Sequence, residues 1–221
     1  AVGQAVVQHP LIKAVGFTGS LAGGRALFDL CAARPEPIPF FGELGSVNPM
    51  FMLPAAMEAR AEELGKGWAA SLTMGAGQFC TNPGIAVVID GAGADAFVQS
   101  AATALQDVAE QVMLTDGIAQ AFCAGRDTLK AAQSLRQVHV ADSTGRNAAP
   151  ALFETTGAEF KANPALHEEV FGPLGLVVRV ASLEEMRALA VELDGQLTIT
   201  LHMGDADVKA ARVLMPVLER K

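Results

Sequence analysis

The chain has 221 residues, of which 51% are hydrophobic and 18% charged, and its formal net charge at pH 7 is −8. This composition excludes an intrinsically disordered chain, and the acidic charge without a lysine or arginine cluster argues against a nucleic-acid partner. No uninterrupted apolar run reaches the roughly 18 residues of a membrane helix, so we expect no membrane partner.

Strand-like and helix-like segments alternate along the chain. Short apolar runs predict strands over residues 12–17, 38–41, 50–53, 85–89, 138–140, 150–155, 174–180 and 197–201. Helical composition and capping signals predict helices over residues 22–33, 55–74, 94–112, 115–135, 182–195 and from 205 onward. Trp68 and Leu72 are four residues apart and predict the buried face of the second helix. The alternation predicts an α/β fold with a mostly parallel sheet that helices cover on both faces.

The turn between the first strand and the first helix is rich in glycine. Glycines stand at positions 16, 19, 23 and 24, around the tripeptide Thr18-Gly-Ser20. Free backbone N–H groups at the start of a helix suit a phosphate. The spacing is not Gly-x-Gly-x-x-Gly, so an ordinary turn between strand and helix also explains the pattern.

Glu43 stands in a second glycine-punctuated turn, Phe40-Phe-Gly-Glu43-Leu-Gly-Ser-Val-Asn-Pro49. Its apolar neighbours predict partial shielding from water, which favours a role as general base. A solvated surface charge is the alternative. This turn is also the expected domain boundary.

The stretch Gly75-Ala-Gly-Gln-Phe-Cys80-Thr-Asn-Pro-Gly84 places a cysteine in a loop dense with glycine. Glycines let the backbone approach a ligand, so Cys80 is a candidate nucleophile that attacks as the thiolate. Cys31 and Cys123 lie in helix-like segments and fit small buried residues. Three widely spaced cysteines predict neither disulfides nor a zinc site, and we expect a reducing, cytoplasmic environment. The histidines have no metal-ligand spacing, so no metal site is predicted.

The stretch Glu169-Val-Phe-Gly-Pro173 leads into the predicted strand at residues 174–180. It is either a connecting loop with Phe171 in the core, or a site where Glu169 accepts hydrogen bonds from ligand hydroxyls. Residues 1–8 look like a helix that lacks its N-terminal start. Residues 208–221 look like a helix that breaks off without a C-terminal end signal. We therefore interpret the chain as a piece of a longer protein.

Four motifs together resemble the aldehyde dehydrogenase family. They are Phe17-Thr-Gly-Ser20, Glu43-Leu-Gly45, Gly77-Gln-Phe-Cys80 and Glu169-Val-Phe-Gly-Pro173. The resemblance covers about half of a typical member. It implies that residues 1–44 are the C-terminal part of a Rossmann-like NAD(P)-binding domain. Residues 45–221 would be the catalytic domain, truncated at its C-terminus.

Two motifs depart from the common family pattern. Ser46 and Val47 replace Gly and Lys, and Ile85 stands where many members have Arg. The forms Glu-Leu-Gly-Ser-Val-Asn-Pro and Gln-Phe-Cys-Thr-Asn-Pro-Gly resemble the α-ketoglutaric semialdehyde (2,5-dioxovalerate) dehydrogenase branch.

The resemblance implies oxidation of an aldehyde to an acid by an NADP- or NAD-dependent oxidoreductase. The Cys80 thiolate would form a thiohemiacetal, hydride transfer would leave a thioester intermediate, and Glu43 would activate the hydrolytic water. The backbone N–H of Cys80 would stabilise the oxyanion, with a second donor from an upstream Asn that this chain lacks.

The resemblance also places residues around the cofactor and the substrate. Gly19 and Ser20 would meet the pyrophosphate, and the Leu44 backbone the carboxamide. Glu169 would bind the nicotinamide ribose and Phe171 would pack against the ring. The wall of the substrate tunnel is expected to include Met74 and Phe79, although both residues could equally belong to the core.

Several readings stay open. The substrate is 2,5-dioxovalerate, giving 2-oxoglutarate, or another semialdehyde such as succinic semialdehyde. A non-redox cysteine hydrolase or acyltransferase and a non-catalytic subunit are alternatives of another class. The family implies a homo-oligomer for the full-length chain, and we expect the 221 residues alone to be inactive.

Overall fold

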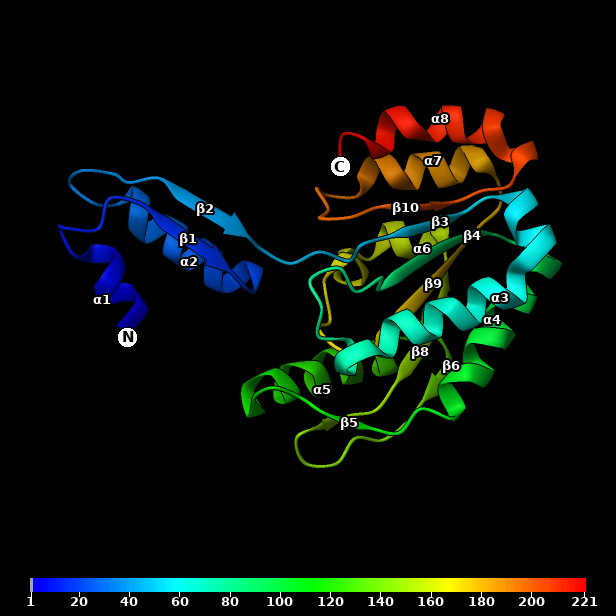
Figure 1. Cartoon of the computed structure of the whole chain (residues 1–221), viewed down its shortest axis with the longest axis horizontal. Helices are drawn as coiled ribbons and strands as arrows, with labels where there is room; N and C mark the ends of the chain where they lie inside the picture. The colour runs from blue at the N-terminus through cyan, green and yellow to red at the C-terminus, as the bar shows by residue number, and fades with distance from the viewer. Residues whose placement is uncertain (1) are drawn as a thin grey trace. The chain divides into compact units, whose positions relative to one another are not determined.

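The computed structural model describes residues 2–221. The chain divides into two compact units, a small unit up to Gly45 and a large unit from Ser46 to Lys221 (Figure 1). The boundary expected from the sequence lies one residue earlier, between residues 44 and 45. The roles expected for the two parts, cofactor binding and catalysis, stay predictions.

The small unit contains α1 (Val2–Gln8), β1 (Val15–Thr18), α2 (Leu21–Ala32) and β2 (Phe40–Glu43). β1 and β2 pair in parallel, and α2 connects them. The strand expected at residues 12–17 begins only at Val15, because Ile12 still donates a backbone hydrogen bond to His9 in the turn after α1.

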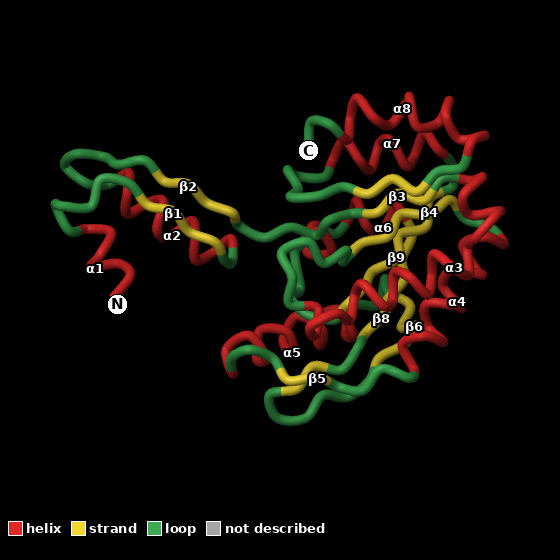
Figure 2. Tube along the Cα trace, in the orientation of Figure 1, coloured by secondary structure: helices red, strands yellow, loops and turns green. Residues whose placement is uncertain are grey.

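The large unit is organised around a six-stranded sheet in the order β10-β3-β4-β9-β8-β6 (Figure 2). All neighbours are parallel except β6, which pairs antiparallel with β8 at one edge. A separate antiparallel ribbon joins β5 and β7. The strands are β3 (Met50–Met52), β4 (Ile85–Ile89), β5 (Gln111–Val112), β6 (Arg136–Val140), β7 (Asn147–Ala148), β8 (Ala151–Thr156), β9 (Leu174–Val180) and β10 (Thr200–His202).

Helices pack against this sheet. They are α3 (Pro54–Thr73), α4 (Ala92–Gln106), α5 (Asp116–Ala131), α6 (Gly157–Ala162), α7 (Leu183–Glu192) and α8 (Val208–Leu218), with short 3-10 turns η1 (Met74–Gly77), η2 (Pro164–His167) and η3 (Asp205–Asp207). Successive strand side chains point to opposite faces. Met50 and Met52 therefore join the core with α3 and α4, whereas Phe51 joins the core with α7 and α8. Both faces are apolar, which explains why the central strands read as continuous hydrophobic runs.

The fold class predicted from the sequence is confirmed: the fold is α/β with a mostly parallel sheet. Trp68 and Leu72 are buried as predicted, with exposed fractions of 2% and 0%. Thr115 caps α5, and its side chain accepts a hydrogen bond from the backbone of Ile118. None of the helices within residues 2–221 is long and apolar enough to cross a membrane.

The helix predicted at residues 115–135 ends at Ala131, and two other helices also end earlier than predicted. The helix predicted to reach residue 112 ends at Gln106, because Gln111 pairs with Ala148 in the β5–β7 ribbon. The helix predicted to end at Gly195 ends at Glu192. These ends are set by contacts with distant parts of the chain, which local composition does not record.

A buried carboxylate joins three strands of the large sheet. Glu154 on β8 is 6% exposed and pairs with Arg136 on β6 and Arg179 on β9. Arg179 also contacts Asp90 and Asp95 at 2.7 and 2.8 Å. Glu154 is therefore the salt-bridge partner of Arg136 and shares Arg179 with two more exposed carboxylates.

We expect Glu154→Ala to lower the free energy of unfolding by about 2–3 kcal/mol, the upper range for hydrogen bonds to charged groups. The loss stays below that of a fully isolated buried pair because Asp90 and Asp95 still neutralise Arg179. Urea unfolding of the chain measures this change, with the exposed Glu63→Ala as control. Equal midpoints for the two variants would contradict the expectation.

Candidate active site

Cys80 lies in an exposed turn that follows η1. The residues before it, Gly75, Ala76 and Gly77, have φ angles of 57°, 59° and 66°. Three successive left-handed residues cannot continue a right-handed helix, so α3 ends here and the chain reverses. The three left-handed residues thus end α3 and lead into the exposed turn that carries Cys80.

Gln111 compensates the unusual backbone at Ala76. The Ala76 N–H donates to Gln111 Oε1 at 3.1 Å, and Gln111 Nε2 donates to the Thr73 carbonyl at 3.1 Å. Gln78 holds the next part of the loop, since its Oε1 accepts from the Leu114 N–H at 2.8 Å. The ribbon strand β5 therefore supports the turn that carries Cys80.

Gly77 brings the Cys80 loop against the turn at residues 171–173. A Cβ atom at position 77 would lie 2.2 Å from the Gly172 carbonyl carbon and 2.5 Å from the Pro173 nitrogen. Only glycine permits so close a backbone approach. Two motifs that lie far apart in the sequence, the Cys80 loop and the Glu169-Val-Phe-Gly-Pro turn, are thus in direct contact.

We expect Gly77→Ala to lower the free energy of unfolding by about 2–5 kcal/mol. Overpacking contributes about 1–3 kcal/mol, and the left-handed conformation adds about 1–2 kcal/mol for a residue with a Cβ. Urea unfolding measures the change. Gly67→Ala in α3 is the matched control, because nothing lies within 4 Å of its added Cβ. An unchanged midpoint for Gly77→Ala would show that the two turns separate easily.

Two asparagine side chains hold the carbonyl groups of this loop. Asn82 Nδ2 donates to the carbonyls of Leu72, Gly77 and Gly172 at 3.1, 2.7 and 3.3 Å. Asn48 Nδ2 donates to the carbonyls of Cys80 and Asn82, each at 2.9 Å.

The backbone of Cys80 therefore has its carbonyl tied to the protein. Within residues 2–221 its N–H has no hydrogen-bond partner. An unoccupied N–H next to a nucleophile is a suitable donor for an oxyanion that forms on the attacked carbonyl.

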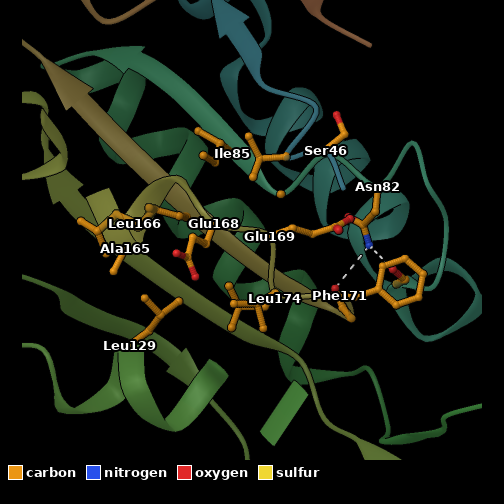
Figure 3. Close-up of a pocket in the computed structure, with 16 residues that line it drawn as sticks. Ser46, Asn82, Ile85, Leu129, Ala165, Leu166, Glu168, Glu169, Phe171 and Leu174 are labelled. Carbon is orange, nitrogen blue, oxygen red and sulfur yellow. Dashed lines mark hydrogen bonds between the residues drawn. The ribbon is translucent and has the colours of Figure 1, made fainter. Parts of the chain in front are cut away.

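Glu169, Phe171 and Asn82 are among the residues that line a small pocket (Figure 3). The pocket has a volume of about 30 Å³, enough for about two water molecules. Desolvation raises the pKa of the Glu169 carboxyl group, although the residue as a whole is exposed to solvent. The nearby Ser46 backbone opposes this rise in pKa. Phe171 is half-buried and is not part of the described core clusters.

Met74 and Phe79 lie at the two ends of the turn before Cys80. They are 59% and 47% exposed, so the alternative that they are plain core residues is wrong. Their place in a substrate tunnel stays a prediction.

The remaining predicted site residues belong to the small unit. Ser20 caps α2, with its Oγ accepting from the Gly23 N–H at 3.2 Å, and Gly19 precedes it. Leu44 packs its side chain on Gly24. Glu43, at the end of β2, is exposed, so the predicted shielding by its apolar neighbours is wrong for this unit. The reason is that Phe41 is itself 68% exposed and Gly42 has no side chain.

Sequence reasoning missed the polar side chains that hold the site, namely Asn48, Asn82, Gln111 and Gln196. Asn48 and Asn82 each precede a proline at the edge of a predicted strand, and this shared Asn-Pro pattern was the available signal. In the part of the chain that the structure describes, no three His, Cys, Asp or Glu residues gather to hold a metal ion.

The fold and the site define an α/β protein that presents an exposed thiol from a tight turn, against a second turn that carries a carboxylate. A sequence profile of the aldehyde dehydrogenase family matches residues 1–202. The chain belongs to this family, as its motifs predicted.

Two curated relatives match the whole chain. The chain is 46% identical over 222 residues to α-ketoglutaric semialdehyde dehydrogenase 2 of Azospirillum brasilense and covers 42% of that protein. It is 39% identical over 223 residues to the α-ketoglutaric semialdehyde dehydrogenase of Acinetobacter baylyi, again covering 42%. The chain thus spans less than half the length of these relatives.

Solved structures share the fold. An NAD-dependent benzaldehyde dehydrogenase from Corynebacterium glutamicum has a TM-score of 0.81 at 22% identity, over 97% of this chain and 47% of that one. A succinic semialdehyde dehydrogenase from Streptococcus pyogenes, in complex with NADP+, has a TM-score of 0.77 at 22% identity, over 98% of this chain and 48% of that one. At such identities the likeness concerns the fold alone.

Proposed function

We propose that the chain is the catalytic part of a longer NAD(P)-dependent aldehyde dehydrogenase that oxidises 2,5-dioxovalerate to 2-oxoglutarate. The observation that carries this proposal is the exposed Cys80 with an unoccupied backbone N–H, in contact with the turn that bears Glu169 and Phe171. The names of the two curated relatives that match the whole chain support the substrate.

In the proposed reaction the Cys80 thiolate attacks the aldehyde carbon, and the Cys80 N–H donates to the oxyanion of the resulting thiohemiacetal. Bound NAD or NADP supplies the hydride acceptor. Loss of hydride from the thiohemiacetal carbon leaves a thioester on Cys80. Glu43 takes a proton from a water molecule, whose oxygen attacks the thioester carbon. The acid leaves and the thiolate is regenerated.

The described residues fit a dinucleotide at two places. Ser20 caps the start of α2, where free backbone N–H groups and the helix dipole favour a phosphate. The Ser20 Oγ accepts from Gly23, and its own hydrogen is still available to a phosphate oxygen. In the large unit the Glu169 carboxylate suits ribose hydroxyls, and the half-buried Phe171 ring suits the flat nicotinamide. Leu44 would contact the carboxamide through its backbone.

The test is formation of reduced nicotinamide by the full-length parent chain. We would offer 2,5-dioxovalerate, succinic semialdehyde and a simple aliphatic aldehyde, each with NAD and with NADP. We expect the highest kcat/KM with 2,5-dioxovalerate and no turnover by the 221 residues alone. Faster turnover of succinic semialdehyde would make this compound the proposed substrate and leave the proposed mechanism unchanged.

A second class of function predicts a different result. A cysteine hydrolase or acyltransferase would cleave a thioester or ester without any nicotinamide. Hydrolysis of such substrates by a folded parent chain that oxidises none of the three aldehydes would overturn the dehydrogenase proposal.

A further inference from the structure

Gln196, just before β10, binds the segment that leads into β3. Its Oε1 accepts from the Val47 N–H at 2.9 Å, the Asn48 N–H at 3.1 Å and the Ser46 hydroxyl at 3.0 Å. Gln196 and Asn48 lie 148 residues apart in the chain. A single side-chain oxygen thus fixes three consecutive residues of a segment that would otherwise be a free loop.

Asn48 connects the segment bound by Gln196 to the Cys80 loop. It is 2% exposed and has a φ of 44°, a left-handed conformation that Asn tolerates better than most residues. Its Oδ1 accepts from the Thr198 N–H and hydroxyl at 3.2 and 3.0 Å, while its Nδ2 donates to the carbonyls of Cys80 and Asn82. The amide of Asn48 therefore joins residues 196–198 to the Cys80 loop.

Ser46 is the third residue of this hydrogen-bond network, and it stands at a position where the family pattern has Gly. Its hydroxyl lies 2.9 Å from Asn48 Oδ1 and accepts from the Leu197 N–H at 3.0 Å. Ser46 also lines the small pocket that Glu169 borders. Ser46 thus belongs both to the network and to the lining of this pocket.

We propose that Ser46, Asn48 and Gln196 form a positioning network for the Cys80 nucleophile. Gln196 acts through Asn48, whose two donated hydrogen bonds hold the Cys80 carbonyl. The network touches no reacting atom, so its effect is on the placement of the thiol and of the Cys80 N–H. The role in catalysis rests on the proposed dehydrogenase function.

The test compares two replacements of Gln196 in the full-length parent chain. Gln196→Glu keeps an oxygen that accepts from the three donors, whereas Gln196→Leu removes it. We expect Gln196→Leu to lower kcat about 10- to 100-fold, as small misplacements of reacting groups do. KM should change less than about threefold, and Gln196→Glu should restore most of kcat. Gln137→Leu is the matched control, since Gln137 on β6 makes one side-chain hydrogen bond, to the Lys130 carbonyl.

A second measurement needs no turnover. Hydrogen exchange in the 221-residue chain should become faster in residues 78–84 for Gln196→Leu and stay unchanged there for Gln196→Glu and Gln137→Leu. If Gln196→Leu fails to fold, Ser46→Ala is the second variant, with the same direction of change expected.

Equal kcat for the wild type and Gln196→Leu, or equal losses for Gln196→Leu and Gln137→Leu, would overturn the positioning role. An unchanged exchange rate in residues 78–84 would overturn the network itself. If the wild-type parent oxidises no aldehyde, the dehydrogenase proposal fails, while the exchange measurement still decides whether the network holds the Cys80 loop.

Discussion

Replacing Cys80 with alanine should lower kcat of the full-length parent chain by about 10⁴-fold or more, the size of loss typical when a covalent nucleophile is removed. The structure supports a large effect because Cys80 is exposed, whereas Cys31 is 1% exposed inside the small unit. Formation of reduced nicotinamide with saturating aldehyde measures kcat. Cys123→Ala, at a half-buried site on α5, is the control and should keep nearly all activity.

Limited alkylation gives an independent check on the same residue. Iodoacetamide at low concentration should label Cys80 before Cys123 and Cys31, because only the Cys80 thiol lies in an exposed turn. Peptide mapping by mass spectrometry identifies the labelled thiol. Activity of more than 1% in Cys80→Ala, or first labelling at another cysteine, would remove Cys80 as the nucleophile.

Glu43→Gln should separate the two halves of the reaction. The amide has the shape of the carboxylate but cannot take a proton from water, so hydrolysis of the Cys80 thioester should slow by about 10²- to 10⁴-fold. Formation of the thioester does not need this base. We therefore expect a rapid burst of about one equivalent of reduced nicotinamide per site, followed by a slow steady state.

Stopped-flow absorbance resolves the burst from the steady state. Glu36→Gln is a suitable control, since Glu36 is an exposed carboxylate of the same unit that pairs with Lys13 at 3.0 Å. An equally large decrease in the rate of the burst phase would mean that Glu43 acts before hydride transfer. That result would contradict the assignment of Glu43 as the hydrolytic base.

Local sequence patterns predicted the central part of the fold well. The strand predicted at residues 174–180 is β9 as observed, and the helix predicted at 55–74 is α3 within one residue at each end. β9 is a continuous apolar run that is almost entirely buried, and α3 is rich in helix-forming residues, so propensity and burial agree. The ends of α4 and α7 were wrong because the chain leaves those helices for contacts with distant residues.

The sequence indicates the candidate reactive groups of the site but not the side chains that support them. A cysteine between glycines is visible in one stretch of sequence, and so is Glu169 before an aromatic-Gly-Pro turn. The contact between these two turns depends on backbone approach at Gly77, and their anchoring depends on Asn48 and Gln196. Such contacts follow from the three-dimensional arrangement of β3 and β10, which one sequence does not reveal. Glu43 shows the opposite error, since apolar neighbours in sequence did not cover it in space.

The pairing of β10 with β3 also sets an order of events during synthesis on the ribosome. Cys80 emerges 116 residues before Gln196, which at about 5–20 residues per second is a delay of roughly 6 to 23 s. Until then the sheet lacks its β10 edge and Asn48 lacks Gln196 and Thr198. The anchoring of the Cys80 loop through Asn48 is therefore complete only after residues 196–198 have been synthesised.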